Sequence, residues 1–239
     1  MAYFFKENGV IAMVTDQIIG HFERQVHEYE CLMERLVPRY KKQHEIIYDL
    51  LPQDTERKIR VLDLGCGNGA LSKLVLKKLP NAHVVGFDLT PKMLEAYVKN
   101  LSEYRGRYEL MQGDYRFDPI GSNYDIVLAG LTLQHLTWGQ RKNFYRLIYT
   151  ILNPKGSFIS NDIIIDEDWD TRNQQYDNWM KFIESNGEDS EYWSDKHMKK
   201  DYPVTLEDHF RWLKDAGFSK VESHWRHNNF AITSAVKEP

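Results

Sequence analysis

The sequence predicts an α/β protein built on a doubly wound, mostly parallel sheet of seven strands that ends in an antiparallel hairpin. Three observations lead to this fold class. Short apolar runs alternate with helical patterns from residue 59 to residue 165. A glycine-rich turn follows the first of these runs, and the chain closes with two strand-like segments. The alternation indicates parallel β-α-β units, because each helix returns the chain to the same edge of the sheet.

Five apolar runs are the expected parallel strands, at residues 59–64, 82–88, 108–112, 124–129 and 156–165. Helices are expected between them, because apolar side chains there recur every three to four positions, at residues 70–79, 91–101 and 140–152. Thr90 is the expected N-cap of the second helix, and Pro91 suits its first turn. After a helix at 206–216, the segments 218–225 and 229–236 are joined by so short a loop that they can pair only antiparallel.

Two units are expected along the chain: a helical N-terminal cap over residues 1–52 and a main domain over 53–239. Within the cap, apolar residues have helical spacing over 16–36 and 39–51. Residues 166–204 form an insertion that is longer than most connections in compact domains. The insertion carries many aromatic and acidic residues and is expected to be partly helical. We interpret it as a lid over a site.

The composition indicates a folded protein and narrows its partners. Hydrophobic residues make up 42% of the 239 residues, charged residues 28%, and the formal net charge is −4. A mildly acidic chain has no general attraction to phosphate backbones, so nucleic acid is not an expected partner. The two cysteines are too few for a disulfide framework. No segment has the roughly 20 apolar residues of a membrane span, and no spacing indicates a metal site. We expect a cytoplasmic monomer or homodimer.

The glycine-rich turn has the clearest chemical meaning. Gly65, Gly67 and Gly69 follow the first strand and open a helix, where glycines allow a sharp turn and a close approach of the backbone to a ligand. The same spacing also fits a dinucleotide-binding turn. Asp63 favours a different ligand, because a carboxylate at the end of the strand attracts an ammonium or sulfonium group and repels a pyrophosphate.

Two more acids end the second and third strands. Asp88 is suited to accept hydrogen bonds from both hydroxyls of a ribose, a role that is shared with dinucleotide enzymes. Asp114, between Gly113 and Tyr115, could accept a hydrogen bond from an adenine amino group, or it could serve only as a cap or turn residue. Together with Asp63, these acids predict a nucleoside ligand with a cationic amino-acid tail.

In these motifs the chain resembles the class I, Rossmann-like methyltransferases, which use S-adenosylmethionine (SAM). The resemblance is carried by the glycine-rich segment 61–69, Asp88, Asp114 and the sequence Thr90–Leu94. It implies SAM as cofactor, S-adenosylhomocysteine (SAH) as product, and Leu89 and Met93 beside the adenine, with Gly113 and Tyr115 also near the cofactor. It further implies a small-molecule acceptor that is methylated by in-line displacement in a lid-covered pocket.

Two segments near the reacting group also fit the resemblance. Residues 22–30 resemble the stretch that precedes many small-molecule members, which implies that Tyr29 lies near the transferred methyl group; otherwise Tyr29 is a core aromatic residue. Leu131 begins the segment that lines the cofactor's methionine end in the family. In the same segment, His135 is the first candidate for a general base, because histidines titrate near neutral pH. His135 could equally orient a backbone carbonyl or pack.

Five further residues are candidates for contacts with the acceptor. Asn161 and Asp162 lie on or just past the fifth strand, near the expected site, because ligands of open α/β sheets bind at the carboxyl ends of the strands. Arg39 and His44 belong to the helical cap, and Trp179 belongs to the lid.

Three other functions fit parts of the sequence. A carboxy-SAM synthase would share the N-terminal segment, the Leu-Gln pattern after the fourth strand and the lid. Those enzymes bind the extra carboxylate with a lid arginine, and no arginine lies between Arg172 and Arg211 here. A SAM-binding regulatory protein would keep Asp63 and Asp88 without a methyl acceptor. A nicotinamide-dependent dehydrogenase is opposed by Asp63 and by the terminal hairpin.

Overall fold

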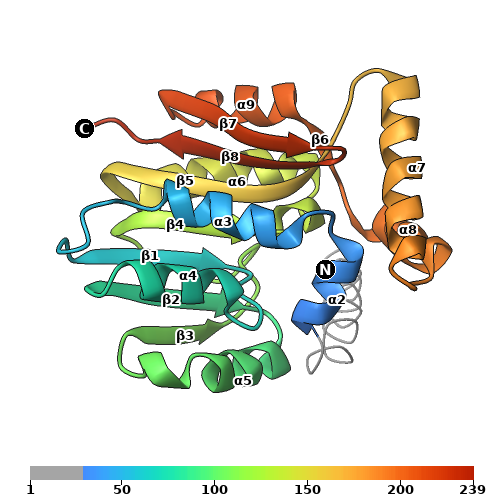
Figure 1. The fold of residues 1–239 in the computed structure, drawn as a ribbon. Helices are drawn as coiled ribbons and strands as arrows, with labels where there is room; N and C mark the ends of the chain where they lie inside the picture. Colours follow the sequence, from blue (N-terminus) through green and yellow to red (C-terminus); the bar gives the residue numbers. More distant parts are fainter. Residues whose placement is uncertain (1–28) are drawn as a thin grey trace, which may run out of the picture.

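A mixed sheet runs through the molecule in the strand order β3-β2-β1-β4-β5-β8-β7. The computed structural model describes residues 29–239 of the chain (Figure 1). Strands β1 to β5 run parallel, and β8 runs antiparallel to both β5 and β7. This arrangement confirms the predicted fold class. The strands are β1 (Ile59–Leu64), β2 (Ala82–Asp88), β3 (Tyr108–Gln112), β4 (Tyr124–Gly130), β5 (Leu152–Ile165), β7 (Lys220–His227) and β8 (Phe230–Val236).

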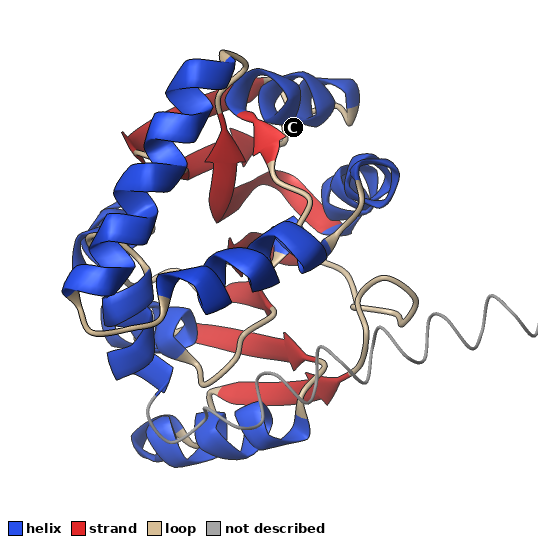
Figure 2. Cartoon of the chain, turned by 90° about the vertical axis from the view of Figure 1, so that its right-hand side faces the viewer, coloured by secondary structure: helices blue, strands red, loops and turns tan. Residues whose placement is uncertain are grey.

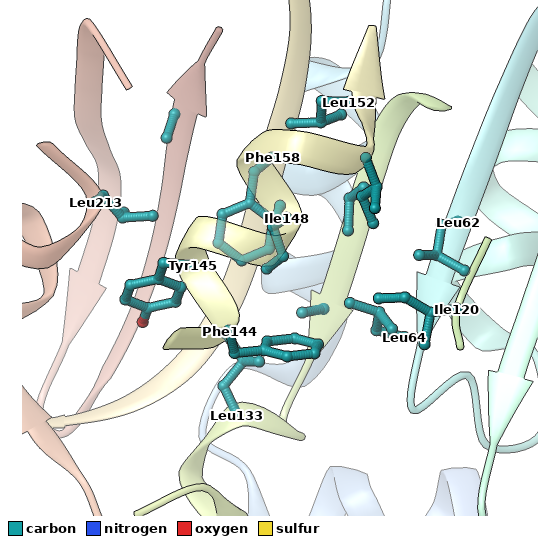
Figure 3. Packing of buried hydrophobic residues seen from close by; sticks show 14 of the residues in the cluster. Leu62, Leu64, Ile120, Leu133, Phe144, Tyr145, Ile148, Leu152, Phe158 and Leu213 are labelled. Carbon is teal, nitrogen blue, oxygen red and sulfur yellow. The ribbon is translucent and has the colours of Figure 1, made fainter. Parts of the chain in front are cut away.

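Helices cover both faces of the sheet (Figure 1). Side chains alternate along the buried strands, so Val61 packs into one core layer whereas Leu62 and Leu64 pack into the other. Figure 3 shows the latter layer, in which Phe144 and Ile148 also take part. One face carries α3 (Tyr40–Leu50), α4 (Ala70–Lys78) and α5 (Pro91–Asn100), and the opposite face carries α6 (Trp138–Ile151) and α9 (Leu206–Asp215).

Three helices, α2 (Tyr29–Leu36), α7 (Trp169–Ser185) and α8 (Ser190–Lys200), lie past the carboxyl ends of the parallel strands (Figure 1, Figure 2). Trp179 of α7 contacts both α2 and β8. Its ring meets Phe230 edge-on with centroids 5.7 Å apart, and its Nε1 donates a 2.7 Å hydrogen bond to the carbonyl oxygen of Leu36. Arg35 of α2 also pairs with Glu188 at 2.6 Å. The insertion at residues 166–204 therefore contains two helices, and it packs on α2.

Element boundaries differ from the predicted ones for local reasons. Helix α6 begins at Trp138 because Thr137 caps it: Oγ1 of Thr137 accepts from the N–H of Gln140, whose side chain accepts from the N–H of Thr137. Strand β5 begins at Leu152 because it continues across a register shift opposite Tyr124. Of the helix expected over residues 16–36, only α2 lies within the described residues.

Short connections account for further differences. Strand β6 (Val204–Thr205) pairs with the end of β5 and was not expected. The hairpin turns at Asn228, which has a φ of 48°. Thr90 precedes α5 as expected, but its side chain makes no capping hydrogen bond. Within residues 29–239, no helix is both long enough and apolar enough to cross a bilayer.

Candidate functional site

The glycine-rich turn between β1 and α4 has a backbone shape that suits glycine. Gly65 and Gly67 have φ angles of 60° and 52°. A Cβ atom on Gly65 would lie 2.3 Å from Oγ1 of Thr132, so this position has no room for a side chain. Among the described residues, nothing lies within 4 Å of a Cβ built on Gly67. The backbone of Gly67 is therefore open toward the cavity that both glycines line.

Asp88, at the end of β2, accepts a hydrogen bond from the backbone of the glycine-rich turn. Its Oδ2 accepts a 2.8 Å hydrogen bond from the N–H of Gly67, and its Oδ1 accepts one of 2.8 Å from the N–H of Thr90. Burial raises the pKa of Asp88, while these two hydrogen bonds lower it. These hydrogen bonds fix the carboxyl group of Asp88 where it lines the cavity beside the turn.

Asp63, at the end of β1, is a buried carboxyl group that contacts a side chain of α4. Its Oδ2 accepts a 2.6 Å hydrogen bond from the hydroxyl of Ser72. Burial raises the pKa of Asp63 to about 7; hydrogen bonds from Ser72 oppose that rise, and the charge of Asp88 adds to it. A cation beside Asp63 would favour its ionised form.

Two adjoining cavities, which we together call the loop cavity, follow the turn along the edge of the sheet. Gly113 does not line them, since it packs against the ring of Phe87. The loop cavity does bring together the other residues predicted to contact the cofactor, which are Asp63, Gly65, Gly67, Asp88, Leu89, Met93, Asp114, Tyr115 and Leu131.

Asp114 lines the loop cavity together with Arg116, a residue that sequence reasoning missed. Nε of Arg116 donates to Oδ1 of Asp114 at 2.8 Å, and the N–H of Arg116 donates to the same oxygen at 3.0 Å. The carboxylate therefore has the turn role that the sequence left open, and it also lines the cavity. Tyr115 is anchored as well, because its hydroxyl donates to the carbonyl oxygen of Thr132 at 2.8 Å.

At its other end the loop cavity is lined by Tyr40 and His44 of α3 and by Asn161 of β5. Nδ2 of Asn161 donates to the side-chain oxygen of Gln43 at 2.7 Å. The buried Oδ1 of Asn161 has no hydrogen-bond partner among residues 29–239, so a ligand with N–H donors would satisfy it. Burial lowers the pKa of His44 to about 4, against the opposing charge of Glu34, so the imidazole is neutral at pH 7.

A further cavity of about 130 Å³, which we call the lid cavity, is lined by α2, α7, α8 and the adjoining strand ends. Most of its lining is apolar, with Trp179 and Ile183 from α7 and Phe230 from β8. Its polar lining includes Gln134, His135, Lys196, His197, Lys200 and Asp201. Tyr29, Leu131 and His135 line both the loop cavity and the lid cavity, so the two cavities meet at these residues.

His135, which ends the short turn η3 (Leu133–His135) after β4, contacts the insertion through Asp201. Nδ1 of His135 lies 2.7 Å from Oδ1 of Asp201, and Nδ1 of His197 lies 2.6 Å from Oδ2. Nε2 of His197 is 3.2 Å from the hydroxyl of Tyr176. Sequence reasoning did not select Asp201, His197 or Tyr176, because no local pattern marks a contact between segments so far apart in the chain.

The remaining residues that were predicted to contact the substrate do not all lie at a cavity. Trp179 lines the lid cavity. Asp162 is 2% exposed and pairs at 2.7 Å with Arg141, and Arg39 is exposed at the start of α3; neither lines the loop cavity or the lid cavity. Within residues 29–239, no group of three or more His, Cys, Asp or Glu side chains is placed to hold a metal ion.

Comparison with known proteins finds relatives of this chain by sequence. A family described as a methyltransferase domain matches residues 61–156. The chain is 26% identical to the carboxy-S-adenosyl-L-methionine synthase of a Nitratiruptor species, over 97% of this chain and 98% of that protein. It is 27% identical to the enzyme of the same name from Klebsiella pneumoniae (strain 342), over 90% of each chain.

Solved structures show the same fold. An O-methyltransferase family protein of Burkholderia thailandensis matches with a TM-score of 0.66 at 17% identity, over 91% of this chain and 62% of that one. Human N-acetylserotonin methyltransferase, in complex with SAM, matches with a TM-score of 0.58 at 18% identity, over 82% of this chain and 52% of that one. This chain therefore spans less than two thirds of the length of these solved proteins.

Proposed function

Because the chain belongs to the class I, Rossmann-like methyltransferases and uses SAM, we propose that it transfers the methyl group of SAM to a small molecule held in the lid cavity. The observation that carries the proposal is the meeting of the two cavities at Tyr29, Leu131 and His135. A donor in the loop cavity and an acceptor in the lid cavity would face each other there. In-line displacement requires that alignment.

The loop cavity suits SAM in charge and in hydrogen-bonding capacity. Asp63 and the unsatisfied Oδ1 of Asn161 would hold the ammonium group of the methionine part. Asp88 would accept hydrogen bonds from the ribose hydroxyls, and Asp114 would accept one from the adenine amino group, with Met93 against the ring. When bound, SAM supplies a methyl group that is already activated by the sulfonium charge.

The protein itself would contribute alignment, exclusion of water and removal of a proton. Apolar side chains such as Trp179 and Phe230 line the lid cavity and would keep water from the reacting atoms. His135 would take a proton from the acceptor. Burial and the charge of Asp88 raise the pKa of Tyr29 well above its usual range. Its hydroxyl therefore stays protonated at pH 7 and can orient a reactant but cannot serve as a base.

Calorimetry with SAH tests the donor site. We expect SAH to bind the wild-type protein, and Asp88→Asn to weaken binding by about tenfold or more, because an amide replaces a charged hydrogen-bond acceptor. Asp177→Asn is the matched control, since Asp177 is an exposed carboxylate on α7. Binding of NAD with no response to SAH would overturn the proposal.

Transfer itself is tested with SAM that carries a labelled methyl group. Pools of small phenols, thiols and amines are offered to the wild-type protein and to His135→Ala, and labelled products are separated by chromatography. We expect wild-type product and a loss of turnover of about 100-fold in His135→Ala. A protein that binds SAH tightly and methylates nothing would instead be a SAM-binding regulatory protein.

A second candidate, chemistry on a carboxylated SAM, is favoured by the similarity to carboxy-SAM synthases over nearly the whole chain. Lys196 and Lys200 line the lid cavity and could pair with a carboxylate there. Mass spectrometry of the nucleoside that copurifies with the protein distinguishes the candidates. Recovery of the carboxylated nucleoside, with its loss in a Lys196→Gln, Lys200→Gln double variant, would favour the second.

A further inference from the structure

A cavity of about 270 Å³ lies where the insertion meets α6 and the end of β5. We call it the junction cavity. Its lining includes Trp138 of α6, Trp169, Arg172 and Tyr176 of α7, Met198 of α8, and Tyr202. We propose that the junction cavity is a second small-molecule site, that it binds a flat aromatic molecule with a carboxylate group, and that this binding holds the insertion against α6 and β5. The site goes beyond the proposed methyl transfer, which makes no use of this cavity.

Large hydrophobic side chains gather around the junction cavity and remain exposed. Among residues 29–239, eight such side chains are exposed, and four of them line this cavity, namely Trp138, Trp169, Met198 and Tyr202. Single exposed hydrophobic residues are normal in a folded protein, but a cluster of them marks a surface that binds a partner or ligand. A cavity of about 150 Å³ can hold benzene. The junction cavity therefore has room for a molecule of two fused rings.

Two of the aromatic rings in the lining are held in place by polar contacts. Nε1 of Trp138 donates to the carbonyl oxygen of Pro203 at 3.3 Å, although the side chain is 58% exposed. The hydroxyl of Tyr176 lies 3.2 Å from Nε2 of His197. Side chains that are already held lose little freedom when a ligand binds, so they favour binding more than mobile ones do. The walls thus suit a ligand pocket, which is usually formed before the ligand arrives.

Arg172 supplies a positive charge to the junction cavity. Its Nε and Nη2 donate to the carbonyl oxygen of Asp166 at 2.8 and 2.6 Å, and its guanidinium lies 6.0 Å from the centre of the Trp169 ring. These contacts fix the group without neutralising it, and Arg172 makes no ion pair within the described part of the chain. A half-buried guanidinium of this kind favours an anion, and its planar donors suit a carboxylate.

Asp201 is the acidic residue of the lining, and it is already paired. Its Oδ2 lies 2.6 Å from Nδ1 of His197. Within residues 29–239, these two are the only residues that line both the junction cavity and the lid cavity. They therefore form a wall between the two cavities. Because Asp201 is paired with His197, its charge opposes an anionic ligand less than a free carboxylate would.

The lining comes from two parts of the chain that a ligand would join. Trp138 and Ile165 belong to α6 and β5, whereas Trp169 and Met198 belong to the insertion. A molecule that contacts both parts binds only when the insertion is seated, and by mass action it stabilises that arrangement. The insertion also forms a wall of the lid cavity. Occupancy of the junction cavity would therefore hold that wall in place.

The position of a bound probe is the direct test, and 2-naphthoate is the probe. Three methionines each line one cavity: Met198 the junction cavity, Met33 the lid cavity and Met93 the loop cavity. Their methyl groups are labelled with ¹³C, and Met198→Leu assigns the signal. We expect saturable nuclear Overhauser contacts from naphthoate protons to Met198, with a Kd of about 1 mM or tighter. Their absence overturns the proposal, whether or not Met33 or Met93 shows a contact.

Matched variants test the hydrophobic wall and the charge. Trp169→Ala and Arg172→Gln should each weaken the binding of 2-naphthoate by about threefold to tenfold. Tyr192→Ala and Lys181→Gln are the controls, because they remove an exposed ring of α8 and an exposed cation of α7 that do not line the cavity. Both should bind like the wild type. Equal binding by Arg172→Gln and Lys181→Gln, or equal binding of the neutral analogue 2-naphthalenemethanol, overturns the proposal.

Hydrogen exchange tests the effect on the insertion. At about ten times its Kd, 2-naphthoate should slow amide exchange in α7 and α8 by up to about tenfold and leave α4 unchanged. Unchanged exchange in α7 and α8, or equal slowing in α4, overturns the proposal. A second copy of the chain seated on this face would instead appear as a dimer in sedimentation that Trp169→Ala dissociates, and that result would also overturn it.

Discussion

The hydroxyl of Ser72 on α4 donates a 2.6 Å hydrogen bond to Oδ2 of Asp63 at the end of β1. Both side chains are almost fully buried, with 0% and 1% exposure. Burial raises the pKa of Asp63 to about 7, and the hydrogen bonds from Ser72 offset part of that rise. The group therefore exchanges its proton near neutral pH when no cation lies beside it.

A pH dependence of donor binding follows from this pair. The ammonium group of SAH favours ionised Asp63, so below pH 7 binding must release the proton that Asp63 holds. We expect the affinity for SAH to rise by up to about tenfold per pH unit as the pH increases toward 7. Calorimetry in buffers of different ionisation enthalpy measures the affinity and the proton released.

The variant Ser72→Ala gives a second test of this pH dependence. Without the hydroxyl the pKa of Asp63 should rise further, so the increase in affinity should extend to higher pH. Thr150→Ala removes an exposed hydroxyl on α6 and should leave the profile unchanged. Affinities that do not vary with pH in either the wild type or Ser72→Ala would mean that Asp63 is not the partner of the ammonium group.

Replacement of Gly65 should damage both stability and donor binding. An alanine there would be strained at a φ of 60°, and its Cβ would lie 2.3 Å from Oγ1 of Thr132. We expect Gly65→Ala to lower the free energy of unfolding by about 2–4 kcal/mol and the affinity for SAH by about tenfold or more, because the turn that lines the loop cavity must shift. Urea unfolding and calorimetry measure the two effects.

Gly187→Ala is the matched control for Gly65. Gly187 has a φ of 79°, and among the described residues nothing lies within 4 Å of a Cβ built on it. Its alanine variant should lose about 1 kcal/mol of unfolding free energy from backbone strain alone and should bind SAH like the wild type. Equal losses in the two variants would show that the contact with Thr132 is unimportant.

Trp179 should be the residue that holds the insertion on α2. It is 6% exposed, it donates to the carbonyl oxygen of Leu36 at 2.7 Å, and its ring meets Phe230. We expect Trp179→Ala to lower the free energy of unfolding by about 3–5 kcal/mol and to reduce amide protection in α2 and α7 first. Denaturant titration and hydrogen exchange measure these effects.

Trp169→Ala provides the comparison, since Trp169 on the same helix is 66% exposed. Its loss should change the free energy of unfolding by no more than about 0.5 kcal/mol. If both variants behaved alike, or if protection fell uniformly across the sheet, Trp179 would not be the specific anchor of the insertion.

A buried histidine should contribute to instability in acid. His209 is held between the hydroxyls of Tyr145, at 2.7 Å, and Thr233, at 2.9 Å. Burial lowers its pKa from 6.5 to about 3, and the charge of Arg141 adds to the shift. The unfolded chain therefore takes up a proton below pH 6.5 that the folded chain excludes, so the stability from neutral His209 is present above 6.5 and is lost as the pH falls toward 3.

The expected slope is about 1.4 kcal/mol per pH unit below the unfolded pKa. Chemical denaturation of the wild type and His209→Gln from neutral pH downward measures it. The stability difference between the two proteins should shrink as the pH falls. Tyr145→Phe keeps the imidazole and should retain the pH dependence. A constant difference between wild type and His209→Gln would show that the imidazole has the same pKa in the folded and the unfolded chain.

The order of strands and helices could be predicted from the sequence, because each element depends on neighbours within a few positions. The period of apolar residues distinguishes strands from helices, and glycine and proline mark where they end. The acids of the loop cavity were also predictable. Asp63 and Asp88 end parallel strands, and the topology of such a sheet brings those ends to one edge.

The sequence did not distinguish the roles of Asn161 and Asp162. They are neighbours within β5, and successive side chains of a strand point to opposite faces. Asn161 meets Gln43 on the side of α3 and lines the loop cavity, whereas Asp162 meets Arg141 of α6 in the core. The alternation is local, but which face holds the cavity depends on the packing of helices from distant parts of the chain.

The sequence by itself determined the class of sheet, the edge at which a ligand would lie and the acids expected to receive a nucleoside. The tertiary structure decided the surroundings of His135. Asp201 reaches it only because α7 and α8 fold back over the carboxyl ends of the strands and because Trp179 seats the insertion on α2. Such a contact leaves no period or motif in the sequence, since its partners are joined by packing rather than by spacing along the chain.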